Sequence, residues 1–278
     1  MDNVATGSGG AINSYLGSSS VSNCVFSGNQ AEHVDGGAII LVDDNSSFQN
    51  CVFCRNTSIE QRGGAIYCSS SNIGNNFTKI SNCTISSNRA GKEGGGIYAV
   101  NSGTMVMVNN TILWSNSASK GAQIALKNGT FGPASLTISY GDVQGGEAAV
   151  YLEPGCMLNW GQGNINIDPC FADANNSDYH LKSQAGRWDA NEGRWTKDEV
   201  TSPCIDAGDP SSPIGYEPFP NGGIINMGAY GGTAEASKSY FGEPPCEIIV
   251  AGDINGDCKV DFEDFALMAL HWLRDENK

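Results

Sequence analysis

A short glycine motif returns along the first half of the chain at a nearly constant interval, and no other feature constrains the fold as strongly. Gly-Gly-Ala-Ile, or a close variant of it, occurs five times, and its isoleucine falls at Ile12, Ile39, Ile66, Ile97 and Ile124. Successive isoleucines are 27, 27, 31 and 27 residues apart. Such self-similarity indicates a stack of repeated units that bury their apolar sides against one another.

A second motif keeps the same interval. It opens on an asparagine, continues through a short and mostly apolar stretch, and closes on another asparagine, over residues 23–29, 50–56, 82–88 and 110–116. Brief alternating stretches such as residues 105–108 lie between the two motifs, and they are too short for helices but typical of half-buried strands. An interval near 27 residues is that of one turn of a parallel β-helix, whose coils stack about 4.8 Å apart.

These observations predict an all-β fold, a right-handed single-stranded parallel β-helix of about five coils. Like residues lie on like residues in such a stack, so the five isoleucines are expected to form an interior aliphatic column. The closing asparagines should form an amide ladder at a bend, made by Asn29, Asn56, Asn88 and Asn116. The paired glycines predict a turn that needs a positive φ or a close approach between coils. Leucine-rich repeats have a similar interval, but their leucine spacing is absent.

The two motifs resemble the repeats of polymorphic outer-membrane proteins, and the resemblance covers residues 9 to about 130. It implies a surface-exposed β-helix. It does not imply one function, because the same solenoid carries adhesins, passenger domains and pectin-lyase-like enzymes.

The solenoid is expected to continue less regularly beyond residue 130, with further strands in residues 136–140, 148–152 and 164–168. Three later stretches resemble the closing coils of secreted β-helix proteins from planctomycete-type bacteria, namely residues 178–181, 202–209 and 225–232. We therefore predict a β-helix over residues 1–240, with an irregular cap from about residue 170, and a separate module over residues 241–278.

The C-terminal module carries oxygen ligands at the spacing of a calcium loop. The side-chain ligands would be Asp253, Asn255, Asp257, Asp261 and Asp264, at loop positions one, three, five, nine and twelve. The backbone carbonyl of Lys259 would be the ligand at position seven. One tight turn must bring about six hard oxygens within about 2.3–2.6 Å of the ion, so this spacing predicts calcium as a cofactor. A helix is expected to follow, with apolar residues on most of its circumference.

This loop and helix resemble one half of a type I dockerin. The resemblance implies calcium-dependent binding of a cohesin-like or cell-envelope partner, for which the candidate contact residues are Phe265, Met268, Leu270 and Trp272. The chain departs from the family in having a single repeat and in placing Cys258 where such loops have glycine. Two alternatives remain open: calcium serves only to fold the tail, or the loop stays empty.

Charge and hydropathy exclude several classes of partner. The formal charge of −15 repels phosphate backbones, so nucleic acid is not expected as a partner. No segment approaches the roughly 18 apolar residues of a membrane span. We expect a monomer, secreted or displayed at the cell surface, whose export signal precedes Met1, since repeat sequence begins almost at once.

Cysteines at one repeat position, Cys24, Cys51 and Cys83, are expected to stack inside the solenoid as small hydrophobic residues. Candidate disulfides are Cys246 with Cys258 and, as a weaker pair, Cys156 with Cys170. No catalytic residues are predicted. The histidines are isolated in sequence, and the acidic candidates for acid–base work, Asp43, Asp44 and Asp142, form no cluster with others.

Two indoles, Trp188 and Trp195, lie in a polar insertion, where they could stack on sugar rings or pack over the cap. The chain as a whole is interpreted as a non-catalytic β-helix scaffold that binds polysaccharide or cell-envelope material and is tethered by its tail. The alternative is a polysaccharide lyase or glycoside hydrolase of pectin-lyase-like fold, which would need a groove lined by three or more acids plus Lys or Arg. A third possibility is a rigid spacer.

Overall fold

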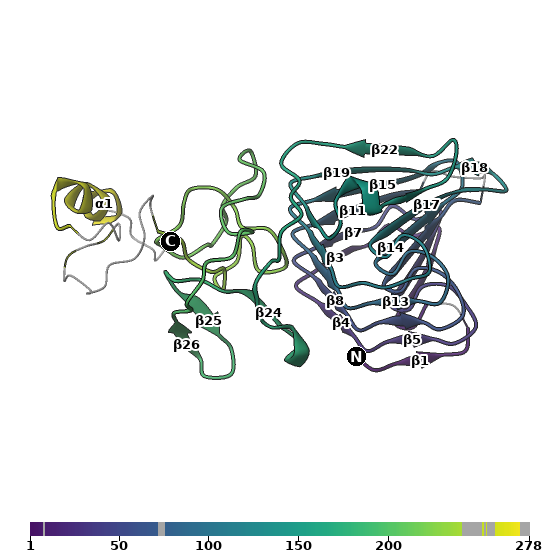
Figure 1. The fold of residues 1–278 in the computed structure, drawn as a ribbon, viewed down its shortest axis with the longest axis horizontal. Helices are drawn as coiled ribbons and strands as arrows, with labels where there is room; N and C mark the ends of the chain where they lie inside the picture. The colour runs from purple at the N-terminus through teal and green to yellow at the C-terminus, as the bar shows by residue number, and fades with distance from the viewer. Residues whose placement is uncertain (8, 72–75, 241–251, 253, 255–258, 273–278) are drawn as a thin grey trace.

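The structure is a computed structural model that describes residues 1–7, 9–71, 76–240, 252, 254 and 259–272. Its larger part is a solenoid of about five turns, in which each strand pairs in parallel with the strand one coil further along (Figure 1). The predicted all-β parallel β-helix with one C-terminal helix, α1 (Phe262–Trp272), is therefore confirmed. Among the described residues, no helix has the length and apolar character needed to cross a bilayer.

Four sheets run along the solenoid, and most of their strands are short. Sheet A contains β1 (Val4–Ala5), β5 (Gln30–Ala31), β9 (Thr57–Ser58) and β13 (Arg89–Ala90). Sheet B contains β2 (Ile12–Tyr15), β6 (Ile39–Val42), β10 (Ile66–Ser69), β14 (Ile97–Val100), β17 (Ile124–Gly129) and β21 (Tyr151–Leu152), with β18 (Gly132–Pro133) antiparallel to β17.

Sheets C and D complete each coil. Sheet C contains β3 (Ser20–Ser22), β7 (Ser47–Gln49), β11 (Asn76–Ser81), β15 (Thr104–Asn109), β19 (Ser135–Ser139) and β22 (Met157–Trp160). Sheet D contains β4 (Val25–Ser27), β8 (Val52–Cys54), β12 (Thr84–Ser86), β16 (Ile112–Trp114) and β20 (Asp142–Val143).

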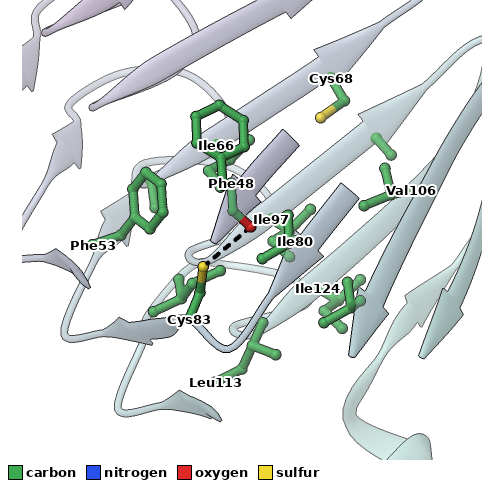
Figure 2. Close-up of a cluster of buried hydrophobic side chains, with 14 of the residues drawn as sticks. Phe48, Phe53, Ile66, Cys68, Ile80, Cys83, Ile97, Val106, Leu113 and Ile124 are labelled. Atoms are coloured by element: carbon green, nitrogen blue, oxygen red, sulfur yellow. Dashed lines mark hydrogen bonds between the residues drawn. The ribbon is translucent and has the colours of Figure 1, made fainter. Parts of the chain in front are cut away.

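The predicted isoleucine column is confirmed by the register of sheet B. Ile12 pairs with Ile39, and the same pairing continues through Ile66 and Ile97 to Ile124. The last four side chains are fully buried, and they lie among residues from sheets C and D (Figure 2). Each isoleucine thus removes its apolar surface from water by contact with the coils above and below it.

The asparagine ladder is also confirmed, and it extends further than the motif predicts. The side-chain amide of each asparagine donates to the Oδ1 atom of the next, from Asn29 to Asn56 (2.8 Å), to Asn88 (2.9 Å) and on to Asn116 (2.9 Å). The same Oδ1 atoms accept backbone N–H groups at 2.9–3.0 Å. Asn3, which the motif does not include, adds a further level by donating to Asn29 (2.8 Å).

The two glycines of each repeat serve different purposes. The first adopts a left-handed backbone, with φ of 72° at Gly36 and 68° at Gly63. The second is required by close packing, because a Cβ atom on Gly37 or Gly64 would collide with the carbonyl oxygen of the glycine one coil further on. Both parts of the predicted turn are therefore present, on successive residues.

Two predictions about cysteines are wrong. Cys51 and Cys83 are buried, but Cys24 is exposed, because β4 is the terminal strand of sheet D and has a neighbour on one side only. Cys156 and Cys170 are free thiols, so the weaker disulfide pair does not form, whereas Cys246 and Cys258 lie outside the described residues.

Two of the later strands are also shorter than predicted. A 3₁₀ turn, η1 (Glu147–Ala149), occupies the start of the stretch over residues 148–152 and leaves only β21 as a strand. Residues 164–168 form a single bridge, from Ile165 to Asp142, because Asn164 is engaged in turn contacts with Gly141 and Gly161.

An irregular segment over residues 171–240 packs beside sheet D. It contains two antiparallel pairs, β23 (Phe171–Asp173) with β24 (Asp178–Leu181) and β25 (Arg187–Asp189) with β26 (Arg194–Thr196), and the 3₁₀ turn η2 (Ala174–Asn176). Its apolar residues join those of sheet D in one buried cluster that includes Ile112, Leu181 and Met227. The boundary between this segment and the tail stays a prediction, since residues 241–251 are not described.

Replacing Asn88 by alanine tests the amide ladder. The substitution removes the acceptor of the Asn56 amide and the donor to the Phe53 carbonyl, in a fully buried place. Leaving such groups unpaired should lower the free energy of unfolding by about 3 kcal/mol, measured by urea denaturation. Asn13→Ala, on the exposed outer face of β2, is the control and should change the free energy of unfolding little. Equal losses in the two variants would contradict the ladder.

Candidate functional site

A groove of about 470 Å³ lies on the outer face of sheet B, and we call it the basic groove. Its lining residues come from three neighbouring coils and are Arg62, Lys92, Glu93, Tyr98, Ser119, Lys120 and Lys127. Four of these seven side chains are cationic, on a chain whose formal charge is −15. The position of each follows from the stacking of the coils.

One column of charged residues passes through the groove at the position before the glycine pair. Asp35, Arg62, Glu93 and Lys120 occupy this position in successive coils, as the backbone bonds from Gly36 to Arg62, Gly63 to Glu93 and Gly94 to Lys120 show. The sign of the charge therefore alternates from coil to coil. Opposite charges one coil apart attract one another, whereas like charges in successive coils would repel along the whole column.

Two of the cations in the basic groove are neutralised by carboxylates. Arg62 binds both carboxylate oxygens of Asp35, with Nε–Oδ1 and Nη2–Oδ2 distances of 2.9 and 3.1 Å. Lys127 lies between Glu153 (2.8 Å) and Glu93 (3.3 Å). The hydrogen bond to Glu153 and the contacts with Glu93 raise the pKa of Lys127, so its ammonium group stays charged.

The other two cations, Lys92 and Lys120, have no carboxylate within ion-pair distance among the described residues. They lie in neighbouring coils, joined by a backbone hydrogen bond from Lys120 to Lys92 (3.2 Å). Lys92 donates to Gln61 (2.8 Å), and the Lys120 ammonium lies 5.0 Å from the ring centre of Tyr151. This lysine pair gives the groove its excess of positive charge.

Tyr98, which lines the groove, belongs to a column of outward-facing residues on sheet B. The register of sheet B places Tyr67, Tyr98, Ala125 and Tyr151 in one outward-facing column. Tyr67 and Tyr98 stack at 5.2 Å between ring centres, but the methyl group of Ala125 interrupts the aromatic column before Tyr151. A small residue at this level leaves room for the side chains of Lys120 and Lys127, both of which lie over Tyr151.

The basic groove contains none of the residues that the sequence analysis put forward for binding. Trp188 and Trp195 face one another across the β25–β26 hairpin at 5.6 Å, half-buried, and Lys238 covers Trp195 at 4.3 Å. The acidic candidates do not meet either. Asp43 and Asp44 are buried acceptors at the turn between sheets B and C, and Asp142 is buried on β20.

The groove residues could have been found from the sequence. The alternating charges directly precede the glycine pairs, and the tyrosines directly follow the core isoleucines at residues 66 and 97. What the sequence does not reveal is the ion pairing, which leaves Lys92 and Lys120 as the groove cations without a carboxylate partner in the part of the chain that the structure describes.

The predicted calcium loop is described only in part. Asp253, Asn255 and Asp257 lie outside the described residues, while Lys259 and Asp261 are exposed. The Asp264 carboxylate is buried and accepts backbone N–H groups from Ile254 (2.6 Å) and Asp261 (2.8 Å). A carboxylate turned inward at position twelve fits a cation loop, and calcium remains a prediction.

The candidate partner residues of the tail lie on α1. Phe265, Met268 and Leu270 are exposed, and Trp272 is the last residue of the helix, although its side chain is not described. Their role in binding a partner remains a prediction.

The segment beside sheet D holds a buried acid, Glu217. Its Oε1 atom accepts N–H groups from Asn226 and Gly232, both at 2.8 Å, whereas Oε2 has no partner among the described residues. Burial raises the pKa of Glu217 to about 7. The carboxyl group of Asp142 is similar, because its burial raises the pKa to about 6.

Comparisons with known proteins match two parts of the chain. Residues 23–39, 50–69 and 82–100 match the repeat of the Chlamydia polymorphic membrane protein, and residues 101–208 match the disaggregatase-related family. The predicted likeness to polymorphic outer-membrane repeats is thus confirmed, whereas the dockerin-like and planctomycete-type likenesses stay predictions. Neither curated proteins nor solved structures include a significant match.

The buried acid predicts a pH dependence of stability. Glu217 has a raised pKa in the folded state, so its contribution to the free energy of unfolding is fully present below about pH 4.5 and is lost as the pH rises through about 7. Between pH 5 and pH 8, Glu217→Gln should therefore lose about 2 kcal/mol less unfolding free energy than the unmodified protein, measured by urea denaturation at each pH. Glu199→Gln, at an exposed position, should behave like the unmodified protein. A pH dependence that Glu217→Gln leaves unchanged would refute this assignment.

Proposed function

We propose that this protein is a surface β-helix that binds an acidic polysaccharide along the basic groove. One observation carries the proposal: Lys92 and Lys120 lie side by side in a hollow without carboxylate partners among the described residues, on a strongly acidic chain. The contacts of both ammonium groups are with uncharged groups, Gln61 for Lys92 and the Tyr151 ring for Lys120. An anionic ligand in the groove would therefore compensate charges that the described part of the chain leaves unpaired.

The lysine pair favours a polymer over a small anion. Lys92 and Lys120 lie in neighbouring coils, about 4.8 Å apart along the axis. A glycan chain running along the groove advances by roughly one coil per sugar unit, so acidic groups on two successive sugars would meet one lysine each. Ser119 lines the same groove, and its hydroxyl oxygen, which donates to the Gly91 carbonyl, can still accept a hydrogen bond from a sugar hydroxyl.

The protonation states favour binding over cleavage. A lyase needs a base that loses its proton near the working pH. Lys127 has a raised pKa, and burial raises the pKa of Tyr98 to about 12, so both stay protonated. A hydrolase needs a protonated carboxyl group beside an ionised one. The hydrogen bond from Lys127 lowers the pKa of Glu153, which keeps this acid ionised.

The comparisons support a location at the cell surface. The matched repeat belongs to a membrane protein by its name, and the stacked coils over residues 23–100 carry that repeat. We further propose that the tail holds the solenoid at the envelope through calcium and a cohesin-like partner. The inward-facing carboxylate of Asp264 and the exposed apolar residues of α1, such as Phe265 and Leu270, support this part.

Removing the lysine pair tests the groove. Lys92→Ala with Lys120→Ala should weaken binding of polygalacturonate or alginate at least tenfold, because each lost charge-assisted contact is worth about 1 kcal/mol or more. Calorimetric titration measures the affinity, which should fall as salt is added, whereas xylan should not bind this groove. Lys79→Ala removes an exposed lysine from the outer face of sheet C and should change nothing. Equal affinities for the paired variant and this control would exclude the groove.

A second titration tests the tail. Asp253→Ala with Asp264→Ala should abolish the heat of calcium binding, because two of the predicted oxygen ligands are lost. Glu263→Ala, which removes a neighbouring exposed carboxylate outside the ligand set, should leave the titration unchanged. The same heats in all three proteins would remove the calcium site.

A further inference from the structure

The opening asparagine of the second motif forms a column of its own on the outside of the solenoid. Asn23, Asn50, Asn82 and Asn110 share a left-handed backbone, with φ between 47° and 53°. Backbone bonds from Asn23 to Gln49, Asn50 to Ser81 and Asn82 to Asn109 keep them in step. Unlike the inner amide ladder, these side chains bond mainly to the irregular segment beside sheet D.

Three members of this outer column bind that segment through its main chain or a hydroxyl group. The Asn50 amide donates to the carbonyl oxygens of Ala229 (3.0 Å) and Gly231 (2.7 Å). Asn82 donates to the Asn226 carbonyl (3.4 Å). Asn110 accepts the backbone N–H of Asp209 (2.7 Å) and donates to the Ser212 hydroxyl (3.2 Å). The column thus binds the main chain where the irregular segment forms turns, as the backbone bonds from Gly231 to Gly228 and from Thr233 to Tyr230 show.

The fourth member, Asn23, has the same backbone conformation but no covering segment. Asn23 is exposed, Asn50 is half-buried, and Asn82 and Asn110 are buried. The valines two residues later show the same difference, since Val25 is 46% exposed and Val52 only 5%. Among the described residues, the Asn23 side chain makes no hydrogen bond in this arrangement.

A cleft of about 340 Å³ opens at this uncovered level. Two strands of sheet D and residues 229–235 form its walls, and the lining residues are Asn23, Cys24, Val25, Asn50, Val52, Ala229, Tyr230, Thr233, Ala234 and Glu235. The lining combines apolar residues with the amides of Asn23 and Asn50 and the half-exposed carboxylate of Glu235. His180 stacks on Tyr230 at 3.6 Å and bonds Glu235 (3.3 Å), which holds that wall in place.

We infer that this cleft binds a turn of a partner protein, whose main-chain carbonyl groups are bound by Asn23 as those of Ala229 and Gly231 are bound by Asn50. The intramolecular interface provides the precedent, because the same residue type in the same column already binds peptide backbone one coil away. The cleft continues that interface directly.

The walls specify the chemistry of the peptide. Val25, Val52 and Ala229 give the cleft an apolar lining, which favours apolar side chains in the peptide. Glu235 at the rim favours a lysine or arginine at one end of the segment. A turn leaves some of its carbonyl groups to side chains, as the turn bonds over residues 228–233 use the carbonyls of Gly228 and Tyr230 but not those of Ala229 and Gly231.

The test uses the full chain and one synthetic probe. The probe is a fluorescent, capped peptide that repeats residues 226–232 of this chain and ends in an added lysine. Anisotropy should report saturable binding, and Asn23→Ala should weaken it roughly threefold to tenfold, the effect of losing a pair of hydrogen bonds. Asn13→Ala, an exposed asparagine of the same coil on sheet B, should bind like the unmodified protein.

Cys24 provides a second and independent measurement. It is the only exposed thiol among the described residues, and it lines the cleft. Alkylation with a bulky maleimide should abolish peptide binding without changing the melting temperature, and Cys24→Ser should be insensitive to the reagent. Absence of saturable binding at millimolar peptide, unchanged binding by Asn23→Ala, or displacement of the peptide by neutral sugars would each overturn the inference.

Discussion

Every structural and functional feature of this protein depends on coils that stack in register, at the interstrand spacing of a sheet. Two internal columns hold that register. The isoleucines of sheet B lie directly over one another and remove apolar surface from water, and the buried asparagines bond from one coil to the next. A shift by one residue would turn the isoleucines outward and leave the amides without partners. Both columns therefore disfavour a shift in register, one because apolar surface would be exposed and the other because hydrogen bonds would be lost. The register in turn fixes the position of every outward-facing residue.

Outward-facing residues are free to differ between coils, and these differences create the sites. The tyrosine column of sheet B becomes a groove where Ala125 replaces an aromatic ring and admits two lysine side chains. The charged column alternates in sign: Asp35 pairs with Arg62 within it, and Glu93 pairs with Lys127 beside it. Lys120 and its neighbour Lys92 are left without a carboxylate partner among the described residues. In this repeat fold, a local site thus forms at the coil where the outward-facing residues depart from the repeat.

The sequence predicted the repeating part of this structure well, because two motifs in step determine which residues stack. It predicted Ile66 in the core and Asn88 in the ladder, and the structure confirms both. It was wrong about Cys24, whose exposure depends on the end of a sheet, and about the start of residues 148–152, where a 3₁₀ turn replaces a strand. The basic groove escaped prediction because an unpaired lysine is defined by distances between coils, which no linear motif records.

The two outer faces of the solenoid differ in the kind of ligand that each can bind, and the reason is charge. Sheet B presents ammonium groups in excess, which bind anions at long range but weaken as salt increases. The outer asparagine column beside sheet D presents neutral amides, which bind carbonyl groups only at contact distance and are insensitive to salt. The amide face already binds a segment of the same chain, through carbonyl groups that lie at fixed positions along it. One molecule could therefore bind an acidic polymer and a peptide at the same time, since the two faces use different residues and respond to different conditions.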